Sequence, residues 1–272
     1  MSRFTKSNLA HVTPVRASAA AALFGAALVL TSCSTASRPN NDLAADQQIL
    51  ATCDAAAPPA ADIQIDGSGS SSSDAITEER FKAIESVVRT TAICSGRLRV
   101  SVFSSSSAAT NIIIDKPLHL DGATDNARLK RLPTLVTDTM TAIRSGYSAT
   151  ASSLPNGGSD ISAEYRLANE WIGQVGAPYR LHLYLLTDGF QNVGFRLDDK
   201  VISKQEAADL ASGVAVPQLP GASVLVAGLG RISGAPPSSE MVDGLIAFYD
   251  ALCKKASAAQ CVSVTDYTVA GR

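Results

Sequence analysis

Residues 180–189 read RLHLYLLTDG, and this stretch decides the fold class of the chain. Leucines recur at every second position from Arg180 and then fill consecutive positions, a pattern typical of a strand in the interior of a sheet. The pattern stops at Asp188 and Gly189, a pair that is typical of a turn. The strongest strand of the chain is therefore expected to end on a loop that carries a carboxylate.

The rest of the chain alternates between strand-like and helix-like segments. Strand patterns occupy residues 61–66, 97–103, 111–115, 222–227 and 261–267. Apolar side chains recur at helical spacing in residues 77–94, 133–143, 162–175 and 238–253, and residues 198–210 have the charge pattern of a solvated helix. This alternation predicts an α/β domain, Rossmann-like, with a mostly parallel central sheet and helices on both faces.

Composition narrows the functional classes. The chain has 272 residues, a formal charge of −2 and a pI near 5.9, so it lacks the basic excess with which proteins neutralise nucleic-acid phosphates. Aromatic residues make up only 5% of the chain, which argues against a base-stacking surface. With only three histidines, a metal site built on histidine is disfavoured as well.

The N-terminal segment has the pattern of an export signal. Basic residues precede an uncharged apolar run, 19–30, which is shorter than the about 20 residues that a membrane-spanning helix needs. The following residues, Leu30-Thr31-Ser32-Cys33, look like a bacterial lipobox, and this resemblance implies cleavage before Cys33 and lipidation of its thiol. The alternative is an ordinary signal peptide with an unmodified cysteine.

We therefore divide the chain into three parts. Residues 1–32 are expected to be a lipoprotein signal peptide, residues 33–56 a lipidated N-terminus with a tether and a short lead-in, and residues 57–272 the folded domain. The tether assignment rests on the small and polar composition of residues 34–45. The predicted location is the extracytoplasmic face of a bacterial membrane.

Four further cysteines fit an exported protein. An even number allows two disulfides in three connectivities. Because helix ends and strand starts share one edge of an α/β sheet, we expect the pairs Cys53–Cys94 and Cys253–Cys261. Four free buried thiols are the alternative, and the spacing does not suit zinc.

Three polar loops are predicted to meet at the other edge of the sheet. They are Asp66-Gly67-Ser68-Gly69-Ser70 after a strand, Gly157-Gly158-Ser159-Asp160 before a helix, and Thr187-Asp188-Gly189 after the strongest strand. Ligands bind parallel sheets at this carboxyl edge, near the switch in strand order. Carboxylates and hydroxyls together suit a hard cation such as Mg²⁺, Ca²⁺ or Mn²⁺.

In this order the loops resemble the von Willebrand factor A domain, whose metal-ion-dependent adhesion site has the pattern D-x-S-x-S, then a Thr, then an Asp. The resemblance covers residues 61–267 and implies the metal ligands Asp66, Ser68, Ser70, Ser159 and Asp188. Ser159 departs from the family's Thr: the hydroxyl is kept, but the methyl that restricts its rotamer is lost. The alternative role for Ser159 is a helix N-cap, and Asp160 is interpreted as an acid in the first helical turn.

The resemblance implies a binding protein rather than an enzyme. We expect it to bind a protein partner that offers an Asp or Glu carboxylate, through Mg²⁺ first and Ca²⁺ or Mn²⁺ as alternatives, with no nucleic acid involved. Neither a G-x-S-x-G elbow nor a phosphate-binding G-x-x-x-x-G-K-[ST] loop occurs in the sequence. Two alternatives stay open, a structural module of an envelope complex with a silent metal site and a metal-assisted hydrolase.

Overall fold

The computed structural model describes residues 43–270, apart from residue 72 and the ranges 107–109 and 155–156. The predicted signal peptide, Cys33 and most of the predicted tether lie outside the described residues. None of the helices within them combines the length and the apolar character that crossing a bilayer requires.

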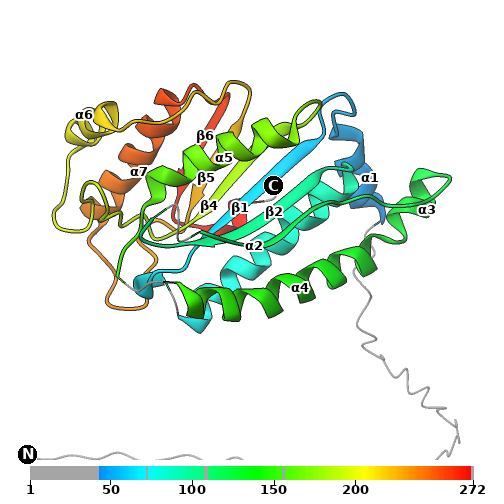
Figure 1. Cartoon of the computed structure of the whole chain (residues 1–272), viewed down its shortest axis with the longest axis horizontal. Coiled ribbons are helices and arrows are strands. Elements are labelled where there is room, and N and C mark those ends of the chain that lie inside the picture. Colours follow the sequence, from blue (N-terminus) through cyan, green and yellow to red (C-terminus); the bar gives the residue numbers. More distant parts are fainter. Residues whose placement is uncertain (1–42, 72, 107–109, 155–156, 271–272) are drawn as a thin grey trace, which may run out of the picture. The chain divides into compact units, whose positions relative to one another are not determined.

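A six-stranded sheet forms the centre of the fold (Figure 1). Its strands are β1 (Pro59–Asp66), β2 (Arg97–Phe103), β3 (Asn111–Pro117), β4 (Arg180–Leu186), β5 (Ser223–Ala227) and β6 (Gln260–Val264). They lie in the order β3-β2-β1-β4-β5-β6, and only the pairing of edge strand β3 with β2 is antiparallel. The predicted α/β class and mostly parallel sheet are confirmed.

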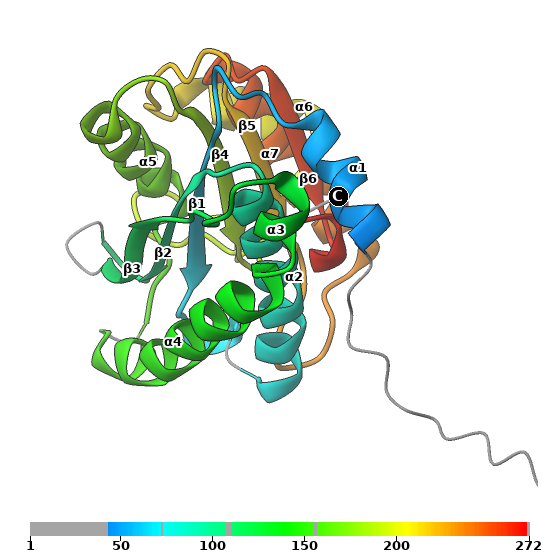
Figure 2. The ribbon, with the colours of Figure 1, turned by 90° about the vertical axis from the view of Figure 1, so that its right-hand side faces the viewer.

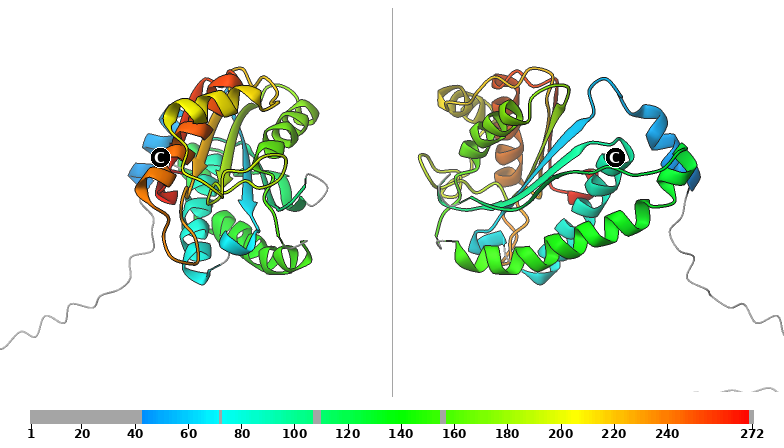
Figure 3. Two further views of the ribbon diagram at one scale, coloured as in Figure 1. Left: turned by 90° about the vertical axis from the view of Figure 1, so that its left-hand side faces the viewer. Right: turned by 45° about the vertical axis from the view of Figure 1, so that its right-hand side comes forward.

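Helices cover both faces of the sheet (Figures 2 and 3). They are α1 (Leu43–Thr52), α2 (Asp74–Ile93), α3 (Asp125–Leu129), α4 (Leu132–Ser153), α5 (Ile161–Val175), α6 (Lys204–Gly213) and α7 (Ser239–Lys255), with the short 3₁₀ turns η1 (Gly69–Ser71) and η3 (Tyr267–Val269). One apolar core joins the sheet to α2 and α4, and a second joins it to α5, α6 and α7.

The alternation of β1 explains why both faces need covering. Ile63 and Ile65 enter the core beneath α2, whereas Asp62 and Gln64 face the side of α5. Asp62 is fully buried and forms two hydrogen bonds with Arg99, of 2.7 and 2.6 Å. A buried charge is tolerated when it is paired in this way.

Both predicted disulfides form. Cys53 and Cys94 are joined with their Cα atoms 5.3 Å apart, and Cys253 and Cys261 are joined at 5.8 Å, both within the range that unstrained backbones allow. The first bridge connects the end of α2 to the segment before β1. The second connects α7 to β6, as the shared sheet edge predicts.

Some boundaries differ from the sequence prediction. Helix α1 lies within residues 33–56, which were assigned to a lipidated N-terminus, a tether and a short lead-in. The helix is held by Arg89 of α2, which donates two hydrogen bonds to Asp46 at 2.9 and 2.8 Å. Helix α4 runs ten residues beyond the predicted end at Ile143, and α6 begins only at Lys204 because the residues before it form a loop.

Candidate functional site

The strand order places the switch point of the sheet between β1 and β4. Connections leave these two adjacent strands toward opposite faces, and this leaves a crevice at their carboxyl ends. Ile65 of β1 pairs with Leu186 of β4, so Asp66 and Thr187, the next residues, lie side by side.

Asp66 is the centre of the site. Its side chain is fully buried and accepts hydrogen bonds from residues of three loops. The Ser68 backbone N–H donates to Oδ1 at 2.9 Å, and the Thr187 hydroxyl donates to Oδ2 at 2.6 Å. Ser159 Oγ lies 3.3 and 3.4 Å from the two carboxylate oxygens. Hydrogen bonds to an ionised acceptor are the strong ones, so the three loops are fastened together at this carboxylate.

The loop after β1 carries two neighbouring hydroxyls, one on the buried Ser68 and one on the exposed Ser70. The Oγ atoms of Ser68, directly before the turn η1, and Ser70, within it, are 3.3 Å apart. Gly67 allows the loop to pass close to β2, because a Cβ there would lie 2.8 Å from a methyl of Val102. The hydroxyls thus stay near Asp66.

A buried arginine of α2 supports this loop from below. Arg80 donates from Nη1 to the main-chain oxygens of Asp66 and Ser71, at 2.9 and 3.2 Å. Its Nε donates to the Tyr267 hydroxyl at 3.2 Å, and its guanidinium lies 5.5 Å from the centre of that ring. Sequence reasoning missed Arg80, because nothing in the helical pattern marks it as buried.

In the second loop, the alternative role of Ser159 as a helix N-cap is wrong. The N-cap of α5 is Asp160, which accepts from the Ala163 N–H, and not Ser159. Asp160 is therefore a cap rather than an acid of the first turn. Freed from capping, the Ser159 hydroxyl points to Asp66, and its main chain exchanges two hydrogen bonds with Asn192, of 3.0 and 3.2 Å.

Asp188 contributes a second buried carboxylate. It is fully buried, and Oδ1 accepts a hydrogen bond of 3.0 Å from the Phe190 N–H. Its other oxygen, Oδ2, is buried with no hydrogen-bond partner within 3.5 Å. Burial first, and the neighbouring charge of Asp66 second, raise the pKa of the Asp188 carboxyl from 3.8 to about 6, and the nearby Ser70 and Ser71 hydroxyls lower this pKa only in part. The charge of Asp66 thus opposes the ionisation of Asp188.

Two amides after β4, which sequence reasoning also missed, hold the third loop against the second. Asn192 pairs with the Ser159 main chain, and the fully buried Gln191 accepts from the Ser162 N–H at 2.9 Å. Gln191 Nε2 donates back to the Ser162 hydroxyl at 3.0 Å. Their position just after Thr187-Asp188-Gly189 is the only sequence feature that could have suggested them.

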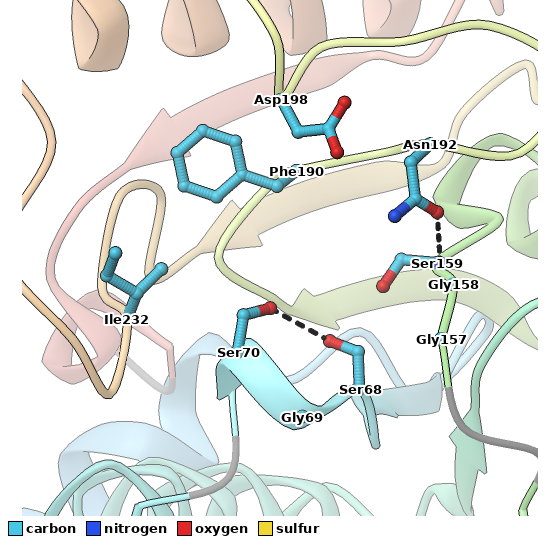
Figure 4. A pocket seen from close by; sticks show the side chains of 10 residues that line it. All are labelled: Ser68, Gly69, Ser70, Gly157, Gly158, Ser159, Phe190, Asn192, Asp198 and Ile232. Carbon is cyan, nitrogen blue, oxygen red and sulfur yellow. Dashed lines mark hydrogen bonds between the residues drawn. The ribbon is translucent and has the colours of Figure 1, made fainter.

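A cavity of about 560 Å³ opens above these loops (Figure 4). Its lining consists of Ser68, Gly69, Ser70, Gly157, Gly158, Ser159, Phe190, Asn192, Asp198 and Ile232. The cavity thus combines hydroxyls, two apolar side chains and a single charged group.

The predicted site residues can now be placed. Asp66, Ser68, Ser70 and Ser159 belong to one group of hydrogen-bonded side chains, and Asp188 lies close enough to Asp66 for their charges to interact. Over the described part of the chain, no three His, Cys, Asp or Glu residues cluster so as to hold a metal ion. A cation here would therefore depend on the hydroxyls, and the role of these five residues as ligands stays a prediction.

No family model matches the chain, and no curated protein matches it. Similar solved structures include an aerotolerance-related membrane protein from Bacteroides fragilis with multiple mutations to serines, at 15% identity and a TM-score of 0.44, covering 78% of this chain and 94% of that one. BatB from Bacteroides thetaiotaomicron has 12% identity and a TM-score of 0.42, covering 76% and 90%. A von Willebrand factor type A protein from Catenulispora acidiphila has 15% identity and a TM-score of 0.33, covering 71% and 37%. At these identities and TM-scores, the similar structures assign no function to this chain.

Proposed function

We propose that the protein binds a partner protein through a divalent cation held at the carboxyl ends of β1 and β4. The observation that carries this proposal is Asp188 Oδ2, a buried carboxylate oxygen without a hydrogen-bond partner beside a second buried carboxylate. An unsatisfied buried polar group costs about 1–3 kcal/mol of stability, and an unsatisfied buried charge costs more. A cation offers the missing partner.

The donor set fits a hard cation. Asp66 and Asp188 supply negative charge, and Ser68, Ser70 and Ser159 supply neutral oxygens, as Mg²⁺, Ca²⁺ and Mn²⁺ prefer. Mg²⁺ is our first choice. The bound ion would supply a positive centre that a carboxylate of the partner can complete, since two acids and three hydroxyls leave part of its coordination open.

We propose binding rather than catalysis. Among the residues that line the cavity, only Asp198 carries an acidic or basic side chain, and it lies on the wall opposite Ser68 and Ser70 (Figure 4). A metal-assisted hydrolase needs a general base beside the ion in addition to the ligands themselves. A hydrolase is therefore the weaker candidate.

We also propose that the protein is a lipoprotein on the extracytoplasmic face of a bacterial membrane, held by a lipid on Cys33. The support is the sequence 30–33 and the two disulfides, which are typical of an oxidising compartment. The loops of the candidate site would then be available to partners in the envelope.

Thermal unfolding tests the metal site. In EDTA followed by excess Mg²⁺ or Mn²⁺, an ion at about 100 times its Kd adds about 2.7 kcal/mol to the free energy of unfolding. For a domain of this size, that shift raises Tm by about 5–10 °C. Asp66→Ala should remove the rise, while Asp199→Asn, which changes an acid outside the cavity lining, should keep it. If neither ion moves the Tm of the wild type, the site is silent and the structural-module alternative is preferred.

A further inference from the structure

The cavity above the candidate site is chemically two-sided. Its lower wall carries the hydroxyls of Ser68 and Ser70, and the Asp198 carboxylate lies on the opposite wall (Figure 4). Asp198 is the one charged residue in the lining. A ligand that reached from one wall to the other would meet a cation at one end and an acid at the other.

The charge of Asp198 is only partly compensated. Its Oδ2 accepts a hydrogen bond of 3.0 Å from Arg196, whereas Oδ1 is buried and has no hydrogen-bond partner. Arg196 is shared, because its Nε also lies 3.5 Å from a carboxylate oxygen of Asp199. Two acids with one arginine leave a net negative charge, and the Asp198 side chain, which is 23% exposed, lines the cavity.

Asp198 sits on a loop that is held in place. The preceding residue, Leu197, is buried, and its N–H donates to the Gln191 main-chain oxygen at 2.8 Å. Gln191 is in turn bonded to Ser162 of α5, and the adjacent Asn192 is bonded to Ser159. The loop that carries Asp198 is thus fastened to the loop that carries a predicted metal ligand, which reduces the entropy lost on binding.

Two apolar side chains lie between the two polar walls. Phe190 follows Asp188 directly, and Ile232 comes from the loop between β5 and α7 (Figure 4). That loop is bonded to η1, since the Ser233 N–H donates to the Ser70 main-chain oxygen at 2.9 Å. The apolar pair can contact the aliphatic stem of a long side chain whose charged end reaches Asp198.

We propose that the partner segment carries a basic side chain next to the carboxylate that binds the cation, and that Asp198 is its receptor. Charge complementarity selects this occupant over a purely acidic or apolar segment. Asp198 is thus a specificity-determining residue of the site. The inference rests on the proposed cation-dependent binding and adds to it the charge of the second contact.

A panel of short peptides with blocked ends tests this assignment. Each peptide contains one Asp and one Arg, separated by zero to three small residues, and is paired with versions in which citrulline replaces Arg or Asn replaces Asp. Binding to the purified protein is measured by calorimetry with Mn²⁺ or Mg²⁺ and again with EDTA. The protein variants are Asp198→Asn and, as the matched control, Asp199→Asn.

We expect an Arg peptide to bind the wild type at least about tenfold more tightly than its citrulline partner, the difference that one hydrogen bond to a charged group makes. Asp198→Asn should abolish this difference, and Asp199→Asn should keep it. Asp199→Asn should bind the citrulline peptides as the wild type does, and the Mg²⁺-dependent rise in Tm should persist in both variants, which shows that the fold and the metal site are intact.

The outcomes separate the two claims. Metal-dependent binding that requires Asp but not Arg would refute the role of Asp198 and leave the proposed function in place. An Arg preference that survives Asp198→Asn would also refute it. If no peptide binds more tightly with the ion than with EDTA, the proposed function fails and this inference fails with it.

Discussion

Thr187 offers a sharp test of how the site is held together. Its hydroxyl donates to Asp66 Oδ2 at 2.6 Å and accepts from the Gly189 N–H at 3.0 Å, so one side chain connects β1 to the turn after β4. Thr187→Val keeps the shape and removes only the hydroxyl. Thr187→Ser keeps the hydroxyl and removes only the methyl.

Asp66, Thr187 and Gly189 are all buried, so a hydrogen bond lost between them is not replaced by water. Removing the hydroxyl takes a hydrogen bond from a carboxylate, at about 1.5–3 kcal/mol, and leaves the Gly189 N–H without an acceptor, at about 1–3 kcal/mol. We therefore expect Thr187→Val to lower the free energy of unfolding by about 3–5 kcal/mol. The methyl removed in Thr187→Ser is worth about 1 kcal/mol.

Denaturant unfolding in EDTA measures both variants without any contribution from an ion. The midpoint with urea or guanidinium, at an unchanged slope, reports the change in stability. If Thr187→Val loses no more than Thr187→Ser, the hydroxyl does not anchor Asp66, and the account of the site as three loops fastened at one carboxylate is wrong.

Three further predictions follow from other buried or terminal groups. Burial raises the pKa of Glu164 from 4.5 to about 8, so the folded state holds a proton that the unfolded state releases. The free energy of unfolding of the wild type should therefore fall as pH rises from about 4.5 to about 8. In unfolding curves measured across pH, Glu164→Gln should not show this fall and should be the more stable protein above pH 8, by up to about a few kcal/mol. Arg80→Met removes a fully buried cation that donates to three oxygens, and it should lower the free energy of unfolding by about 3–5 kcal/mol. Arg144→Met, which removes a surface ion pair, should lower it by less than about 1 kcal/mol. Equal losses in the two unfolding curves would contradict the supporting role of Arg80. Cys33→Ala should move the protein from the membrane fraction to the soluble fraction and abolish labelling by a fatty-acid analogue, whereas unchanged membrane association would exclude the lipid anchor.

The sequence by itself determined the fold class and the edge of the sheet at which the predicted site residues meet. Apolar alternation located the six strands, and Asp66 and Asp188 could be assigned to one edge because parallel strands bring their carboxyl ends together. The same reasoning found both disulfides, since each joins segments that the topology places at the opposite edge. These conclusions need only the order and the type of the elements.

Only the tertiary structure decided which neighbour each polar group meets. Asp160 rather than Ser159 caps α5, Arg80 is buried beneath the first loop, and Asn192 joins the second loop to the third. Asp198 reaches the cavity wall because Leu197 is buried one residue earlier. The contacts of Arg80 and Asn192 join separate segments of the chain at distances near 3 Å. Local pattern cannot specify them, because a shift of one residue in a loop exchanges one hydrogen-bond partner for another.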